Sequence, residues 1–278
     1  MTVGDFVGQL VPPILMKSFM KIFTQKEQQE IFLSGDYESW NEAVTASMGY
    51  DSDLILEKTK DALLKVKNGE AIYERDSVIF NEVQYAWPLL AGLMWVAAKS
   101  DGRLNVLDFG GSLGSTYFQN LAFFHELSEI HWNIIEQSEH VKVGKEYFED
   151  DILKFYPNIE ICLSETKPNI ILLSGVLQYL ESPYGMFDTL LDHLTCDTVI
   201  IDRTSFWDGS TDMLCIQHVP PSIYSATYPI WIFSRQKFLQ YLQKRNFEIV
   251  AEFQSLDMLK APVRAVWKGM VLERKKSS

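Results

Sequence analysis

From residue 103 to the end of the chain, short apolar segments alternate with segments of helical periodicity, and this alternation restricts the fold more than any other feature. The strand-like segments are LNVLDF, HWNIIEQ, a weak one near Phe155, NIILLS, DTVIIDRT, FEIVAEF and RAVWKGMVLER. Strands that alternate with helices form a mainly parallel sheet with helices on both faces. The last two strands follow each other directly, so the last one is expected to run antiparallel. The pattern predicts an α/β fold with a seven-stranded sheet.

Three parts of the chain differ in their patterns. Residues 1–33 predict an apolar helical arm, residues 34–102 predict a helical cap, and residues 103–278 contain the strands and helices of the sheet. Within the last part, residues 203–234 show little regular structure. A loop of that length inside a compact domain is usually functional, so it is expected to act as a lid.

Two interpretations fit the arm of residues 1–33. Its apolar face suits a helix lying on a membrane surface, and it equally suits an arm packed on the protein body or on a second subunit. No stretch reaches the roughly 20 apolar residues of a spanning helix. The three cysteines have no paired spacing, which indicates a protein of the reducing cytoplasm. The protein would associate with a membrane only if the arm binds one.

The segment NVLDFGGSLGSTYF, residues 105–118, predicts a strand, a glycine-rich loop and the start of a helix. Glycines let the backbone approach a ligand closely, and a helix start directs its N–H groups toward it. A nicotinamide fingerprint needs G-x-G-x-x-G, but here its third and sixth positions are serine. The P-loop pattern is absent as well. The candidate ligand-binding residues in the loop are Asp108, Gly110, Gly111, Ser112 and Gly114.

The pattern acidic-x-G-x-x-x-G resembles the first motif of class I S-adenosylmethionine-dependent methyltransferases, with Ser112 in place of the central glycine. That resemblance implies a Rossmann-like sheet and S-adenosylmethionine as the cofactor. Glu136 ends the next strand, where a carboxylate can accept both ribose hydroxyls, and Gln137 would lie beside the adenine. The resemblance also implies that Ser174 and Gly175 lie against the methionine part.

Longer blocks make the resemblance narrower. GDYESW, KVKNGEAIYERDSVIFNEVQYAWPLLAGL, ILLSGVLQYLESP and VPPSIYSATYPIWIFS are similar to a group of bacterial methyltransferases met among surface-polysaccharide biosynthesis genes. The similarity runs from about residue 33 to about residue 255. It implies methyl transfer to an oxygen of a sugar or a glycan-linked small molecule.

Methyl transfer mainly needs an aligned acceptor, and a general base helps when the acceptor is a hydroxyl. In the expected lid, His218 is the candidate base, because histidine titrates near neutral pH. Arg203 either clamps an anionic group of the acceptor or pairs with Asp202. The remaining candidates are Tyr224 in the catalytic set and Arg75, Tyr179 and Tyr228 in acceptor binding.

Other functional classes fit less well. The net charge of -12 argues against binding to nucleic acid, and the histidines and cysteines show no metal-ligand spacing. A catalytically inactive methyltransferase-like module that binds a partner is the alternative function. A nucleotide-sugar or nicotinamide oxidoreductase is third, because the third glycine and a Tyr-x-x-x-Lys relay are missing.

Overall fold

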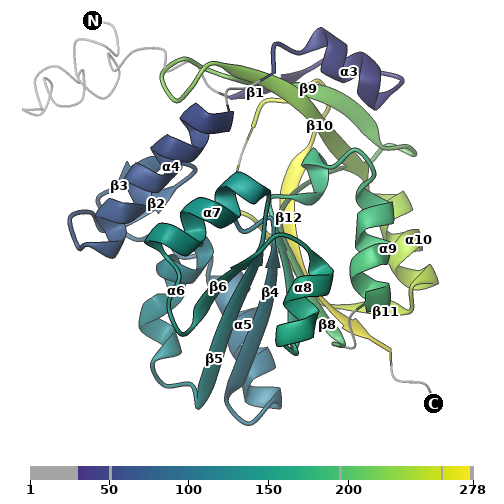
Figure 1. Ribbon diagram of the computed structural model, residues 1–278. Coiled ribbons are helices and arrows are strands. Elements are labelled where there is room, and N and C mark those ends of the chain that lie inside the picture. Colours follow the sequence, from purple (N-terminus) through teal and green to yellow (C-terminus); the bar gives the residue numbers. More distant parts are fainter. Residues whose placement is uncertain (1–30, 50–51, 194–195, 258, 276–278) are drawn as a thin grey trace, which may run out of the picture.

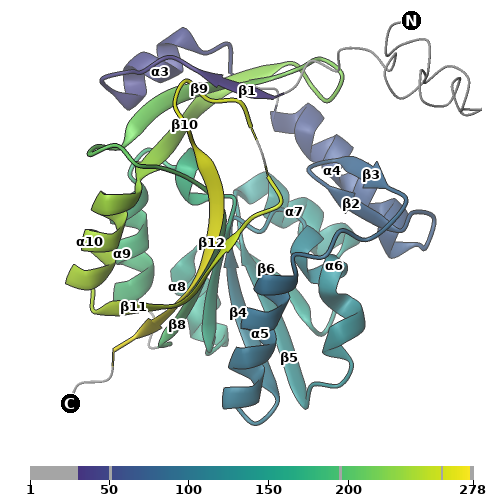
Figure 2. The ribbon, with the colours of Figure 1, turned by 180° about the vertical axis from the view of Figure 1, so that it is seen from behind.

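The computed structural model describes residues 31–49, 52–193, 196–257 and 259–275. A twisted sheet crosses the middle of the molecule, with helices on both faces (Figures 1 and 2). Its parallel centre has the order β6-β5-β4-β7-β8. These strands are β4 (Arg103–Phe109), β5 (Glu129–Ile135), β6 (Leu153–Tyr156), β7 (Ile170–Ser174) and β8 (Thr198–Trp207). The strand order reverses around β4 and β7, which is where open α/β sheets bind ligands.

Two antiparallel strands complete the seven that the sequence predicts. β12 (Val266–Arg274) pairs with β8, and β11 (Phe247–Gln254) pairs with β12, both antiparallel. The Rossmann-like α/β fold and the antiparallel last strand are thus confirmed.

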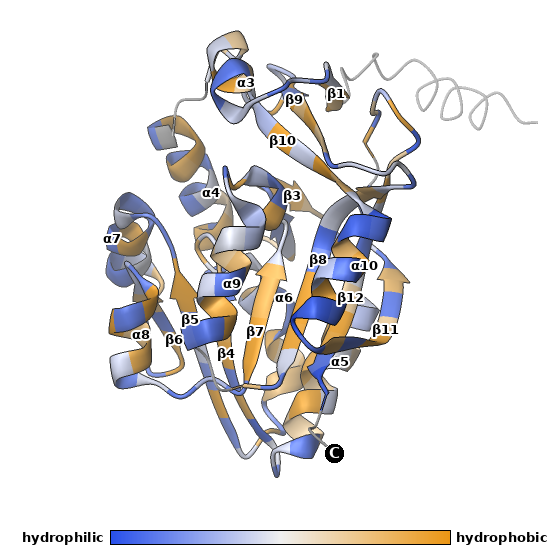
Figure 3. Cartoon of the chain, turned by 90° about the vertical axis from the view of Figure 1, so that its right-hand side faces the viewer, coloured by the Kyte–Doolittle hydropathy of each residue, from blue (hydrophilic) through white to orange (hydrophobic). Residues whose placement is uncertain are grey.

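Helices bury apolar faces on both sides of this sheet. One hydrophobic cluster lies under α4 (Ser52–Lys67), α5 (Trp87–Lys99), α6 (Ser115–Phe124) and α7 (Ser138–Tyr147). The other lies under α8 (Ile159–Glu165), α9 (Pro183–His193) and α10 (Arg235–Lys244). The central strands are apolar along most of their length, whereas the outward helix faces are hydrophilic (Figure 3). This pattern is expected for parallel strands covered on both faces.

The predicted helical cap of residues 34–102 contains more than helices. α3 (Trp40–Ala46) is capped by Ser39, and β2 (Tyr73–Arg75) and β3 (Val78–Phe80) form a hairpin. α5 packs on the sheet itself: a Cβ on Gly92 would lie 2.7 Å from the Ile200 side chain in β8. The segment is therefore a helix-and-hairpin cap followed by a sheet-covering helix.

The expectation of a loop with little regular structure at residues 203–234 is wrong. β8 continues to Trp207, and β9 (Met213–Val219) and β10 (Ala226–Ser234) form an antiparallel pair. β10 also pairs in parallel with the last residues of β8, so the insertion extends the sheet (Figure 1). The apolar residues of β9 and β10 bury Leu214, Ile216, Ile230 and Ile232, which stabilises strands where a loop was expected.

Most of the predicted arm lies outside the described residues. At its end, Phe32–Ser34 is strand β1, paired antiparallel with β9, so the helix expected to residue 33 is wrong there. None of the described helices combines the length and apolar character that a membrane span requires.

Candidate functional site

A cavity of about 470 Å³ lies at the carboxyl ends of β4 and β7. Its size is within the range of small-molecule and cofactor sites. Ten of the predicted site residues line it: Arg75, Asp108, Gly110, Gly111, Ser112, Ser174, Gly175, Tyr179, Arg203 and Tyr224. Gly114, Glu136, Gln137, His218 and Tyr228 do not line it.

Side chains pack so closely against the loop after β4 that two of its glycines leave no room for a Cβ atom. Gly110 has φ +73°, and a Cβ there would overlap the Val176 side chain; a Cβ on Gly111 would lie 2.5 Å from the Asp108 carboxyl carbon. Gly114 has φ +102° and directly precedes α6. Ser112, the departure from the usual glycine, adopts φ +52°, a conformation that is strained for most side chains.

A hydrogen bond joins this loop to the end of β5. The backbone N–H of Ser112 donates to Oε1 of Glu136 over 3.1 Å, and the N–H of Gln137 donates to Oε2 over 2.8 Å. The Glu136 carboxylate therefore lies against the glycine loop. Gln137 is exposed and lines a separate surface pocket between α4 and α7, so it lies outside the central cavity, and its position beside the adenine stays a prediction.

Asp108 is a buried acid at the end of β4. Its side chain is 1% exposed, and Oδ2 accepts a hydrogen bond from Nε1 of Trp132 over 2.9 Å. Burial raises the pKa of Asp108 to about 7, and the nearby charge of Glu136 acts in the same direction. A cationic group bound in the cavity would favour the ionised form.

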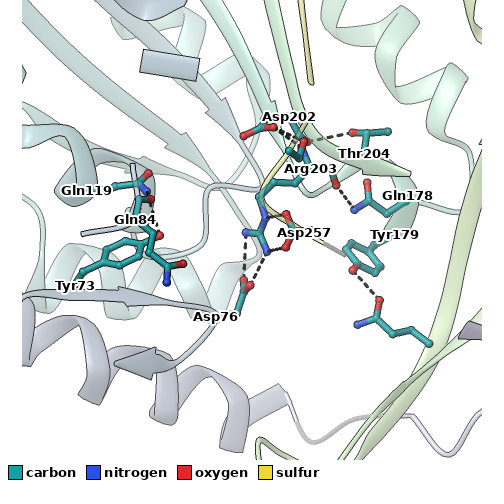
Figure 4. A network of polar contacts seen from close by, with 12 residues as sticks. Tyr73, Asp76, Gln84, Gln119, Gln178, Tyr179, Asp202, Arg203, Thr204 and Asp257 are labelled. Atoms are coloured by element: carbon teal, nitrogen blue, oxygen red, sulfur yellow. Dashed lines mark hydrogen bonds and ion pairs between the residues drawn. The ribbon is translucent and has the colours of Figure 1, made fainter. Parts of the chain in front are cut away.

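Arg203 is the centre of the polar network on the opposite wall (Figure 4). Its guanidinium donates to both oxygens of Asp257, over 2.8 and 3.2 Å, and to both oxygens of Asp76, over 2.5 and 3.3 Å. Only its backbone N–H contacts Asp202. Two carboxylates thus balance its charge. The predicted side-chain pair with Asp202 is wrong, and a clamp on an acceptor anion would have to displace one of these carboxylates.

Glu74 is buried in the β2–β3 hairpin, next to the start of α6. It is 1% exposed, accepts a hydrogen bond from the Ser115 hydroxyl, and accepts another from the N–H of Ser77 over 3.1 Å. Burial raises the pKa of Glu74 to about 7. The hairpin is thereby fastened to the cavity wall through a serine that itself lines the cavity.

Tyr179 and Gln217 line the far side of the cavity. The Tyr179 hydroxyl donates to Oε1 of Gln217 over 2.9 Å, and Nε2 of Gln217 donates to the hydroxyl of Tyr228 over 2.8 Å. Burial raises the pKa of Tyr179, so this phenol is a neutral hydrogen-bond donor. Tyr228 belongs to the same chain of hydrogen bonds but does not itself line the cavity.

His218 does not belong to the cavity. Side chains alternate along a strand, and because Gln217 lines the cavity, His218 lies on the other face of β9. There its Nε2 is 2.7 Å from the Ser34 hydroxyl, and its ring stacks on Phe32 with centroids 4.4 Å apart. The predicted role of His218 as a base is therefore wrong for this site.

Several lining residues were not predicted from the sequence. Asp257 follows β11 in a connection without any motif, whereas Gln217 interrupts the apolar strand MLCIQHV as a polar residue. Gln178 is 2% exposed, donates to the Arg203 carbonyl over 2.9 Å, and leaves its own Oε1 without a partner in the described ranges. In the same ranges, no group of three His, Cys, Asp or Glu side chains is arranged to hold a metal ion.

Comparison with known proteins finds likeness in structure only. No protein-family profile matches the chain, and no curated protein matches its sequence. A S-adenosylmethionine-dependent methyltransferase from Clostridium acetobutylicum has 10% identity and a TM-score of 0.45, covering 67% of this chain and 90% of its own. The N-terminal domain of EvdMO1, studied with SAH and D-fucose, has 14% identity and a TM-score of 0.47, with 82% and 98% covered. CalS10, an amino pentose methyltransferase from Micromonospora echinaspora, has 9% identity and a TM-score of 0.43, with 69% and 93% covered.

Proposed function

We propose that the chain is an S-adenosylmethionine-dependent methyltransferase that methylates an oxygen of a sugar or a glycan-linked small molecule. One observation carries the proposal. At the point where the strand order reverses, the glycine loop after β4 and the carboxylate after β5 are joined by the Ser112–Glu136 hydrogen bond beside the central cavity. A carboxylate that can accept from two vicinal hydroxyls, beside a loop whose backbone a ligand can approach, supports the proposal.

The residues present fit the cofactor. S-adenosylmethionine carries a sulfonium and an ammonium group, and the acids Asp76, Asp108 and Asp257 line the cavity. Its carboxylate suits the N-terminal end of α6, where Ser115 and Thr116 also line the cavity. In this proposal, Asp108 and Gly110 to Gly114 hold the amino-acid end. Glu136 holds the ribose, and Ser174 and Gly175 contact the methionine part.

A hydroxylated acceptor suits the other end of the cavity. Asp76 and Asp257 are carboxylates that accept hydrogen bonds, and Arg203 already neutralises part of their charge. An anionic acceptor would meet this acidic pair without a free cation at Arg203, whereas sugar hydroxyls can donate to it. Arg75, Tyr179 and Tyr224 complete the wall available for the acceptor. The Arg75 guanidinium lies over the Phe80 ring and has no ion pair in the described ranges.

The cofactor when bound supplies an activated methyl group on sulfur. Transfer of that methyl group to an acceptor oxygen would release the hydroxyl proton to a base or to water. Desolvation opposes ionisation of Asp76, but the charge and hydrogen bonds of Arg203 lower the pKa of that carboxyl below its ordinary value. In the proposed reaction, Asp76 stays ionised and accepts a hydrogen bond from the acceptor hydroxyl, while Arg203 and Tyr224 position the acceptor.

Glu136→Gln is expected to weaken S-adenosylmethionine binding about 10- to 100-fold in isothermal titration calorimetry. Glutamine keeps one acceptor oxygen, so the variant would lose one charge-assisted hydrogen bond to the ribose hydroxyls, which contributes about 1.5–3 kcal/mol. Glu139→Gln is the matched control, because Glu139 is an exposed acid three residues further along in α7. Equal affinities for wild type and Glu136→Gln would contradict the site. Binding by the wild type without methyl transfer to any glycan precursor would favour the non-catalytic module.

A further inference from the structure

A second pocket lies beside the central cavity, beneath α3. Its volume is about 400 Å³, and it is bounded by α3, the start of α4, the turn after β7 and the start of β10. Its lining residues include Trp40, Val44, Ile55, Tyr179, Tyr228 and Pro229. None of the lining residues in the described part of the chain carries a charge. The pocket therefore suits hydrocarbon better than a polar group.

Tyr179 separates the two spaces, because its side chain lines both of them. Figure 4 shows its hydroxyl bonded to an amide, which is that of Gln217 in β9. The Tyr179 and Tyr228 rings pack edge to face with centroids 5.7 Å apart, and Gln217 bonds both hydroxyls. The two tyrosine hydroxyls and the Gln217 amide thus satisfy one another by hydrogen bonding. The two rings leave apolar surface toward the second pocket.

Apolar side chains near the pocket are left in contact with water. Val44, which lines it, is 48% exposed, and Met48 at the end of the same segment is 77% exposed. Exposed apolar side chains that gather at one place mark an interaction site. Val44 lies at the pocket that Tyr179 shares with the central cavity, whereas Met48 lines a neighbouring pocket with Phe32 and His218.

We infer that the methyl acceptor carries an apolar group, an alkyl chain or comparable hydrocarbon, that binds in this second pocket while its hydroxylated part lies in the central cavity. The inference rests on the proposed methyltransferase function and adds the chemical class of the acceptor. The lining residues change from polar to apolar from the central cavity to the second pocket, as the two ends of such a molecule require. The carboxylates around Arg203 come first, then the amide of Gln217, and then the aromatic rings and Val44.

Hexyl and octyl β-D-glucoside, used below their micellar concentrations with S-adenosylhomocysteine present, test this inference by calorimetry on the full chain. Each buried methylene is expected to tighten binding about fourfold, so octyl glucoside should bind at least about 10-fold more tightly than hexyl glucoside. Val44→Asp should remove most of this advantage. Thr45→Asp is the matched control, because Thr45 is an exposed neighbour in α3 that does not line the pocket.

Equal affinities for the two glucosides would overturn the inference, as would equal losses in Val44→Asp and Thr45→Asp. A dimer of the wild type that Val44→Asp converts to a monomer in sedimentation would also overturn it, because a second copy would then occupy the pocket. Circular dichroism checks the fold, and Val44→Ser replaces Val44→Asp if the latter unfolds. Failure of S-adenosylhomocysteine to bind would instead remove the proposed function, so the two failures are distinguishable.

Discussion

Arg203→Ala is expected to lower the free energy of unfolding by about 3 kcal/mol, measured by urea denaturation at neutral pH. The guanidinium makes two contacts with Asp257 and two with Asp76, so its removal leaves two carboxylates facing each other without a cation. Breaking a buried pair by removing one partner costs about 3–5 kcal/mol. The lower figure applies because only the pair with Asp257 is largely buried, with side chains 27% and 17% exposed, whereas the Asp76 side chain is 58% exposed.

Arg245→Ala is the matched control for this prediction. Arg245 also pairs with two carboxylates, Asp188 and Asp192, but these are 43% and 63% exposed. Exposed pairs contribute about 0–1 kcal/mol, so this variant should change stability little. Arg203→Lys should lose part of the stability, because an ammonium cannot bond both carboxylates in bidentate fashion. Equal losses in Arg203→Ala and Arg245→Ala would contradict the central role of the network.

Glu74→Gln is expected to make the protein about 3 kcal/mol more stable relative to wild type at pH 8 than at pH 5. Burial raises the pKa of Glu74 from 4.5 to about 7 in the folded state. The folded state therefore keeps a proton that the unfolded chain has released, and wild-type stability falls as the pH rises from about 4.5 to 7. At about 1.4 kcal/mol per pH unit, the loss comes to about 3 kcal/mol.

Glutamine has nearly the shape of the protonated carboxyl and does not ionise, so the variant should lack this part of the pH dependence. Urea denaturation of both proteins at pH 5 and pH 8 measures it. Glu70→Gln, at an exposed position just before the hairpin, should keep the wild-type dependence. If the free energy of unfolding changed equally with pH in wild type and Glu74→Gln, the prediction would be contradicted, because folding would then leave the pKa of Glu74 unchanged. Asp108, whose pKa burial also raises to about 7, adds a similar dependence that both proteins share.

The sheet was largely predictable because its signals are local. Buried parallel strands are continuous apolar runs, and the helices between them repeat near 3.6 residues, so strands, helices and their alternation follow from neighbouring residues. The glycine loop was predictable for the same reason. Gly110, Ser112 and Gly114 adopt the left-handed conformations that a tight strand-to-helix turn needs.

The acceptor side was less predictable because its contacts are distant in sequence. Residues 203–234 were expected to form a loop, but the YPIWIF segment belongs to β10, where Pro229 pairs opposite Ile216 in an antiparallel strand pair. Once β9 is a strand, alternation turns Gln217 toward the cavity and His218 away from it. Because adjacent side chains of a strand point to opposite faces, Gln217 lies in the site and its neighbour His218 does not.

By itself, the sequence determined the α/β class, seven of the ten strands described in the main sheet and the place of the glycine loop, because hydrophobic periodicity and turn chemistry act over a few residues. Tertiary structure alone decided the electrostatics of the site. Arg203 in β8 binds Asp76 from the hairpin, 127 positions earlier, and Asp257 from a connection 54 positions later. Long-range ion pairs and burial depend on which surfaces the folded sheet brings together, and no local pattern records that.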